Sequence, residues 1–324
     1  MTVLLGRGES GSHVTLIFTV NDDSTNLDEQ GSLGAGLCLE HGVETIARGI
    51  EGDFGINVEF IQGNGNSELY EKVLRLLSKD ISNIKNYNWD LAVKLKLPIS
   101  QGFGMSAAGA VAAAMAFQRA IGEPHEKSLR RALAIAHRVE RSRSTGLGDV
   151  TALAAGGVER RISPGSPFSS NLLSKGPGIS EGWVEDIEVI LAWKNDSGKH
   201  TSSYIDSPAW KDAISKAGIK QMNELSKNDW HKGRWGELLE RSEAFAKESG
   251  LLSDSRRFEL VKDAENIIDL LALEFKPLLC MLGESLVIVP KEIGRKNDLE
   301  ISEIIYALND IGFMTQKTRV KKLF

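Results

Sequence analysis

The segment running from Pro98 to Gly109, Pro-Ile-Ser-Gln-Gly-Phe-Gly-Met-Ser-Ala-Ala-Gly, carries the clearest chemistry in this chain. Glycines let a backbone approach a ligand closely, and the first N–H groups of a helix have no acceptor within it. Together with the positive end of the helix dipole, these donors attract phosphate. Residues 106–121 are rich in alanine and contain one charge, Arg119, so we expect a buried helix with a fixed N-terminus. The segment predicts phosphate binding, with a tight structural turn as the alternative.

Other familiar chemistries are absent from the sequence. It contains no Gly-x-x-x-x-Gly-Lys-Ser/Thr loop and no His-Glu-x-x-His zinc motif. The stretch from Gly104 to Ala108 resembles a nucleophile elbow, but its second glycine arrives one residue late, at position 109. Two cysteines, Cys38 and Cys280, form neither a disulfide framework nor a zinc site. Phosphate binding therefore leads the hypotheses.

Composition limits the class of protein. A chain of 324 residues with a net charge of −5 is long enough for two domains, and its acidic balance argues against a nucleic-acid partner. The early charges Arg7 and Glu9 argue against a signal peptide, and no apolar run is long enough to span a bilayer. We therefore expect a soluble cytoplasmic protein without a membrane partner. The basic residues between Lys317 and Lys322 are interpreted as a solvated tail.

The elements that must position the glycine segment follow from periodicity and turn signals. Strands are predicted at 14–20, 56–61 and 91–97, and helices at 69–77, 106–121 and 127–143, with a short helix before Gly156. We place a domain boundary near Gly182, giving domains 1–182 and 183–324. The second domain is predicted as strands 187–193, 284–289 and 313–320 with helices 208–227, 234–249, 256–275 and 302–311. This mixture indicates an α+β protein.

The pattern Pro-x-x-x-Gly-x-Gly-x-Ser-Ala-Ala resembles the central phosphate-binding motif of the GHMP kinases, the superfamily that includes homoserine and mevalonate kinases. Residues 144–149 are similar to the family's loop with a catalytic aspartate, and residues 281–285 to its third glycine motif, with fewer glycines. Five segments between residues 31 and 284 most resemble the archaeal pantoate kinases. The first motif matches least, because residues 11–18 keep a His and a Thr but lose the family's Pro and both of its Gly.

The resemblance implies a two-domain GHMP kinase fold, with a ribosomal-protein-S5-like N-terminal domain and a ferredoxin-like C-terminal domain. It further implies transfer of phosphate from ATP to the primary hydroxyl of pantoate, on the way to coenzyme A. The loop 98–109 would then hold ATP, and the Ser106 hydroxyl and Glu140 carboxylate would supply hard oxygen ligands to Mg²⁺. The residues assigned to ATP are Pro98, Gly102, Phe103, Gly104, Met105, Ser106, Ala107 and Ala108.

Two residues are assigned to catalysis on the same basis. Asp149 would accept the proton of the acceptor hydroxyl or orient that hydroxyl, and its alternative role is a helix N-cap. His13 stands where relatives similar to mevalonate kinase carry a lysine. It would polarise the hydroxyl or the γ-phosphate, or bind the substrate, unless it is only bonded to the backbone at a strand end.

Four residues are predicted to contact the substrate: Ser32, Arg161, Thr201 and Gly283. The Arg161 guanidinium suits the pantoate carboxylate, although Arg160 is an alternative because a register slip would exchange them. Arg161 could also be a surface partner of Glu159. Rival functions are another GHMP kinase, a decarboxylase of the same fold, or an ATP-binding protein without activity. A homodimer is plausible.

Overall fold

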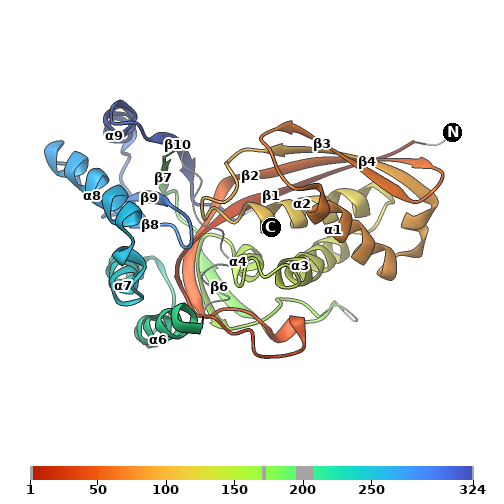
Figure 1. Cartoon of the computed structure of the whole chain (residues 1–324), viewed down its shortest axis with the longest axis horizontal. Helices are drawn as coiled ribbons and strands as arrows, with labels where there is room; N and C mark the ends of the chain where they lie inside the picture. Colours follow the sequence, from red (N-terminus) through yellow and green to blue (C-terminus); the bar gives the residue numbers. More distant parts are fainter. Residues whose placement is uncertain (1–2, 170–172, 195–207, 323–324) are drawn as a thin grey trace.

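The structure is a computed structural model that describes residues 3–169, 173–194 and 208–322. Thr201, predicted to contact the substrate, lies outside these residues. Two lobes stand side by side, each with its own sheet and helices (Figure 1). The first strand, β1 (Val3–Phe18), starts at the far end of the first lobe and runs to the junction with the second.

The sheet of the first lobe is built around a long antiparallel hairpin. Strand β2 (Gly34–Glu51) pairs with β1 along nearly its whole length, and the sheet order is β3-β4-β2-β5-β6. Strand β1 begins well before the predicted strand 14–20, and no strand was predicted where β2 lies. The remaining strands are β3 (Gly55–Gln62), β4 (Tyr87–Leu95), β5 (Val158–Ser163) and β6 (Ile179–Trp183).

Helices cover one face of this sheet in two layers. Helix α2 lies directly on β1 and β2, with α3 beyond it (Figure 1). The approach is close, because a Cβ added at Gly8 would lie 1.8 Å from the Ala112 carbonyl oxygen. The prediction of a buried small-residue helix is therefore confirmed. The helices are α1 (Ser67–Asp80), α2 (Met105–Ala120), α3 (His125–Arg141) and α4 (Asp149–Ala155), with the 3₁₀ turns η1 (Leu27–Glu29) and η2 (Ser82–Asn86).

The second lobe has a four-stranded antiparallel sheet in the order β10-β7-β9-β8. Numbered along this lobe, that order is 4-1-3-2, the arrangement of a ferredoxin-like β-α-β-β-α-β unit with extra helices after its first strand. Its strands are β7 (Glu188–Trp193), β8 (Phe275–Leu279), β9 (Ser285–Pro290) and β10 (Met314–Arg319). Its helices are α6 (Pro208–Leu225), α7 (Trp235–Glu248), α8 (Ser255–Leu270) and α9 (Asp298–Asp310), with the 3₁₀ turns η3 (Lys232–Arg234) and η4 (Leu251–Ser253).

Two predictions for this lobe were wrong. The helix predicted at 256–275 ends at Leu270, and β8 follows it. The basic residues read as a solvated tail begin inside β10, where Lys317 and Arg319 form ion pairs with Glu188 at 3.0 and 2.7 Å. Charge alone does not distinguish a tail from an edge strand, and edge strands commonly carry lysine.

The junction between the lobes is formed by backbone contacts. Thr15 of β1 makes a bridge with Met281, and Leu39 of β2 makes one with Val320. Because the first sheet ends at Trp183 and the second begins at Glu188, we propose the domain boundary between these strands, close to the expected 182/183. Among the described residues, no helix is both long and apolar enough to span a membrane.

Candidate active site

A cavity opens where the loop 98–104 enters α2. The loop turns through left-handed conformations at Gly102 (φ 77°) and Gly104 (φ 60°), which glycine adopts without a Cβ clash. It is held on both sides. The backbone N–H of His13 donates to the Phe103 carbonyl at 3.3 Å, and a Cβ at Gly283 would lie 2.1 Å from the Gln101 carbonyl oxygen. The N-terminus of α2 is therefore presented to the cavity in one orientation.

A buried carboxylate faces that helix end. Ser106 in the first turn of α2 donates its hydroxyl to Glu140 Oε2 at 2.9 Å, while Glu140 Oε1 is buried without a hydrogen-bond partner among the described residues. Burial, followed by repulsion from Asp149, raises the pKa of Glu140 to about 7. A carboxylate with an unused oxygen beside a hydroxyl is a fitting pair of ligands for a hard cation.

Gly146 lies between the two acidic side chains of the site. A Cβ at this position would lie 2.4 Å from Glu140 Oε2 and 2.6 Å from Asp149 Oδ2. Any side chain here would therefore push the two carboxylates apart. Asp149 is the first residue of α4, whose N-cap is Gly148, and its side chain is 18% exposed at the cavity wall.

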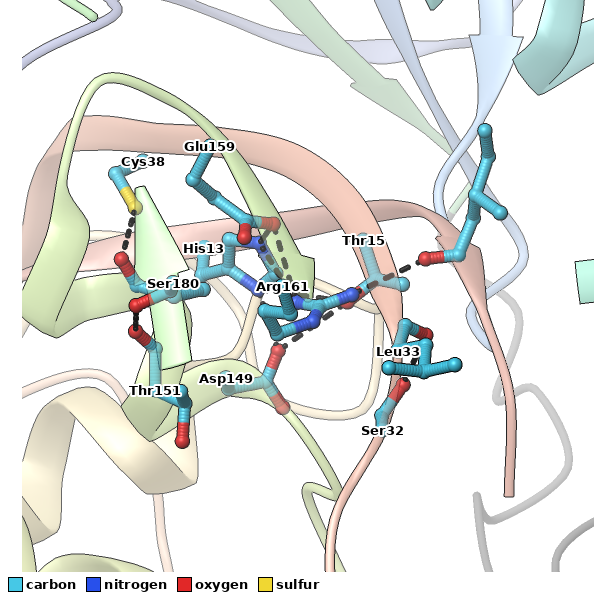
Figure 2. Close-up of polar contacts among 12 residues, drawn as sticks. His13, Thr15, Ser32, Leu33, Cys38, Asp149, Thr151, Glu159, Arg161 and Ser180 are labelled. Carbon is cyan, nitrogen blue, oxygen red and sulfur yellow. Dashed lines mark hydrogen bonds and ion pairs between the residues drawn. The ribbon is translucent and has the colours of Figure 1, made fainter. Parts of the chain in front are cut away.

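A cluster of four ionisable side chains lies behind Asp149. Figure 2 shows His13 and Arg161 lying between Glu159 and Asp149. The His13 Nδ1 is 2.7 Å from Asp149 Oδ1, and its Nε2 is 3.0 Å from Glu159 Oε1. Arg161 Nη1 is 3.1 Å from the same Glu159 oxygen, and Nη2 donates to the Ile17 carbonyl at 3.1 Å. His13, Glu159 and Arg161 are fully buried.

The charges of this cluster support one another. Burial lowers the pKa of His13, but hydrogen bonds and charges from Asp149 and then Glu159 outweigh it, so its pKa is raised above the ordinary value. Burial likewise opposes ionisation of Asp149, yet His13 and Arg161 hold the pKa of that carboxyl below its ordinary value. The cluster thus pairs His13 and Arg161 with the carboxyl groups of Asp149 and Glu159, and the lowered pKa of Asp149 favours its ionised form.

Few cations line the cavity. Among its described lining residues, the cationic side chains are Arg143 and Arg161. Arg161 is fully buried and paired with Glu159, whereas the Arg143 side chain is 25% exposed and 3.6 Å from the exposed Glu68. Arg143 is therefore the cationic group better placed to meet an incoming anion.

Comparison with known proteins places this arrangement in a family. Residues 68–157 match the model of the GHMP kinases N terminal domain. The pantoate kinase of Thermococcus kodakarensis is 27% identical over 98% of both chains, and that of Methanospirillum hungatei is 29% identical over 76% of both. A solved phosphotransferase related to the CoA biosynthesis pathway is 25% identical, with a TM-score of 0.76 over 98% of this chain and 96% of its own. This chain is similar to GHMP kinases in sequence and in fold.

More distant relatives share the fold. The mevalonate diphosphate decarboxylase of Enterococcus faecalis is 14% identical, with a TM-score of 0.66 over 99% of this chain and 98% of its own. The two-domain GHMP kinase architecture predicted from sequence is therefore confirmed. In this chain the glycine loop 98–104, the carboxyl groups of Glu140 and Asp149, and the buried cluster behind Asp149 lie close together around one cavity.

Most predicted site residues gather around the cavity. Its lining includes Gly102 through Ser106, Ser32, Asp149 and Arg161, with Glu140 directly behind Ser106. Pro98 begins the loop, and Ala107 and Ala108 are fully buried inside α2, so only their backbone can serve a ligand. Gly283 packs against the back of the loop and is not part of the lining.

The structure corrects several details of the predicted site. His13 does not line the cavity, and its two ring nitrogens lie 2.7 Å and 3.0 Å from carboxylate oxygens of Asp149 and Glu159. Asp149 is not an N-cap. Arg161 and Glu159 are not a surface pair, since both are fully buried. Arg160 points away, with its Nε 2.6 Å from Glu181, so Arg161 is the arginine that faces the site.

Two residues were missed by sequence reasoning, Arg143 as a cavity cation and Glu159 as a partner of His13. The two-residue spacing of Glu159 and Arg161 placed them on one strand face, but which face is buried depends on the whole sheet. The available signal was Gly36, which lies opposite Glu159 in the sheet. Only a residue without a side chain fits there, because a Cβ at this position would lie 2.5 Å from His13 Nε2.

Proposed function

We propose that this chain transfers the γ-phosphoryl group of ATP to the primary hydroxyl of pantoate, giving 4-phosphopantoate and ADP for coenzyme A biosynthesis. One observation carries the proposal: an ionised carboxylate, Asp149, faces the same cavity as the glycine loop at the N-terminus of α2. Phosphoryl transfer needs this combination of a phosphate cradle and a group that orients the acceptor. The likeness to pantoate kinases across the chain supports the choice of acceptor.

The acceptor side is served by Asp149. Its Oδ1 accepts from His13 and, at 3.4 Å, from Thr15, while Oδ2 lies on the side of Gly146 and the Ser106–Glu140 pair. The pantoate oxygen attacks the γ-phosphorus as the bond to the β-phosphate oxygen breaks, and its proton passes to Asp149 Oδ2. An aliphatic alcohol is a weak acid, so orientation of the hydroxyl precedes proton transfer.

The phosphate side is served by backbone and two polar groups. The first N–H groups of α2 and the residues from Gly102 to Ser106 cradle the triphosphate. Arg143 neutralises part of its charge. Ser106 and Glu140 are the residues that would hold Mg²⁺, and the ion would supply neutralisation of the phosphate charge.

The pantoate carboxylate is assigned to Ser32 and Arg161. Both residues line the cavity, and the Arg161 Nε is buried without a hydrogen-bond partner among the described residues. A carboxylate that reaches this N–H would gain a charge-assisted hydrogen bond. Thr201 remains a prediction from the sequence alone.

The first experiment measures ADP release by the purified protein with ATP and Mg²⁺. D-pantoate, mevalonate, homoserine and pantothenate are offered separately, and carbon dioxide is measured alongside ADP. We expect release with pantoate alone. Release with another acceptor would replace the substrate, carbon dioxide release would indicate a decarboxylase, and ATP binding without turnover would overturn the assignment as a kinase. We also propose a homodimer, which light scattering of the purified protein tests.

A further inference from the structure

Glu159 is a buried carboxylate that the reaction described above does not use. It is fully buried on β5, it does not line the cavity, and its Oε2 has no hydrogen-bond partner among the described residues. Burying an ionised carboxylate is unfavourable unless other groups compensate for the lost hydration. Its contacts go to two cations, His13 at 3.0 Å and Arg161 at 3.1 Å.

We propose that Glu159 is a positioning residue: it holds His13 with both ring N–H groups donated to carboxylates and thereby fixes Asp149 with one oxygen bound and the other directed at the acceptor. The role rests on the proposed kinase function, because Asp149 is the group that meets the hydroxyl. The geometry is a continuous chain of contacts from Glu159 Oε1 through the imidazole to Asp149 Oδ1 (Figure 2).

The two carboxylates decide which form of His13 is present. A neutral imidazole has one N–H and one bare nitrogen, and a bare nitrogen facing either carboxylate would place two lone pairs 2.7 to 3.0 Å apart. The doubly protonated ring removes that conflict. Arg161 is the second positive group, so the cluster carries two positive and two negative groups with no net charge. The raised pKa of His13 agrees with this arrangement.

Within the described ranges, the imidazole makes no hydrogen bond or ion pair with any ionisable side chain other than Asp149, Glu159 and Arg161. The elements around it contribute Thr15 from its own strand, Asp149 from α4, Glu159 and Arg161 from β5, and Cys38 opposite it on β2. Burial raises the pKa of the Cys38 thiol, so this side chain stays neutral. Glycines on β2 leave the necessary space. A Cβ at Gly34 would lie 2.2 Å from Arg161 Nη2, and one at Gly36 would lie 3.1 Å from Glu159 Oε1.

The direct test is NMR of the histidine ring in the whole protein, without substrate. In the wild type we expect His13 to show two ring N–H protons that persist above pH 8, assigned by their loss in His13→Gln. In Glu159→Gln we expect one of these two ring N–H protons to be lost below pH 8, and the His13 pKa to be lower by at least about one unit. A single ring N–H in the wild type at neutral pH would overturn the proposal even if the variant fails to fold.

The matched control is Glu181→Gln. Glu181 is on the neighbouring strand β6 and pairs with Arg160 on the opposite face of β5. The substitution therefore removes an acid–arginine pair from the same part of the sheet. We expect its His13 signals to be those of the wild type. The same change in both variants would show a general effect of disturbing the sheet and would contradict a specific link from Glu159 to His13.

Kinetics then separate positioning from packing. We expect Glu159→Gln to lower kcat about tenfold or more while the KM for ATP changes less than about twofold, because the phosphate side is untouched. In a His13→Gln background, the same change should cost less than about twofold, since its route to Asp149 is already gone. If the fold-losses in kcat of the two substitutions multiplied in the double variant, the route through His13 would be overturned. The NMR result does not depend on the acceptor, so failure with pantoate would leave it standing.

Discussion

The two halves of the active site are built differently. On the phosphate side, the loop 98–104 and the start of α2 offer backbone N–H groups, and the nearest carboxylate, Glu140, keeps one oxygen without a partner among the described residues. On the acceptor side, His13 and Arg161 are paired with Glu159 and Asp149 at 2.7 to 3.1 Å before any ligand arrives.

The contrast follows from what each half must bind. A triphosphate with its cation brings its own charges, so the protein leaves hydrogen-bonding capacity open for them. An alcohol brings no charge, so the group that orients it must be fixed and ionised in advance, and compensating charges are buried with it. The phosphate half is therefore completed by its ligand, whereas the acceptor half is complete in the free protein.

The largest effect is expected at the acceptor half. Asp149→Asn keeps the size of the side chain but removes the proton acceptor, so we expect kcat to fall by at least about 100-fold. Initial rates of ADP release at saturating ATP and pantoate measure it, with thermal unfolding as the check on folding. Asp90→Asn is the control, because Asp90 is a half-exposed partner of Arg48 on the sheet. A loss smaller than tenfold would exclude Asp149 as the base.

The next effect probes the open capacity of the phosphate half. Glu140→Gln replaces an anionic ligand by a neutral one, so we expect the Mg²⁺ concentration for half-maximal rate to rise about tenfold or more. Titration of activity with Mg²⁺ at fixed ATP measures the change. Glu126→Gln on the exposed part of the same helix is the control. An unchanged Mg²⁺ requirement would mean that Glu140 does not hold the ion.

A smaller effect is expected from Arg143, the partly exposed cavity cation. Arg143→Gln removes a charge-assisted hydrogen bond to phosphate, worth about 1.5 kcal/mol or more, so the KM for ATP should rise about tenfold. The KM for pantoate should change little. Arg130→Gln, on α3 and paired with Glu126, should leave both values unaltered. A rise in the pantoate KM instead would move Arg143 to the acceptor half.

Local sequence signals located the helices well but mistook parts of the sheets. No strand was predicted at 34–51, yet Gly34 and Gly36 lie in β2, where Arg161 and His13 occupy the space of the missing side chains. Another missed strand, β8, contains Pro277. It is tolerated there because β8 is at the edge of its sheet. Both errors concern contacts between distant segments, which local patterns do not contain.

For the site, resemblance supplied the residues and the structure supplied their relations. Ser106 and Asp149 stand in motifs that could be matched by eye, and both line one cavity, with Glu140 bonded to Ser106. The pairing of His13 with Glu159 joins residues 146 positions apart, on two strands that each pair with β2. The sequence predicted a functional role for His13, but its contacts with Asp149 and Glu159 decide which role it can have.

The smallest effect tests whether the acceptor half is held together in advance by its own polar contacts. Helix α3 holds the segment that carries Ser32, and one of its contacts is His137, whose Nε2 donates to the Leu27 carbonyl at 3.1 Å. Burial lowers the pKa of His137 from 6.5 to about 4. Because the folded-state pKa is depressed, this stabilisation is present above pH 6.5 and is lost as the pH falls towards 4.

At pH 5 the linked loss amounts to about 2 kcal/mol of the free energy of unfolding. His137→Gln cannot be protonated, so its stability should fall less than that of the wild type between pH 7 and pH 5, by about this amount. Urea unfolding at the two pH values measures the difference. His125→Gln, exposed at the start of the same helix, should follow the wild type. If all three proteins lost stability equally, His137 would not be buried in its neutral form, and the contact with Leu27 would not be part of a preformed acceptor half.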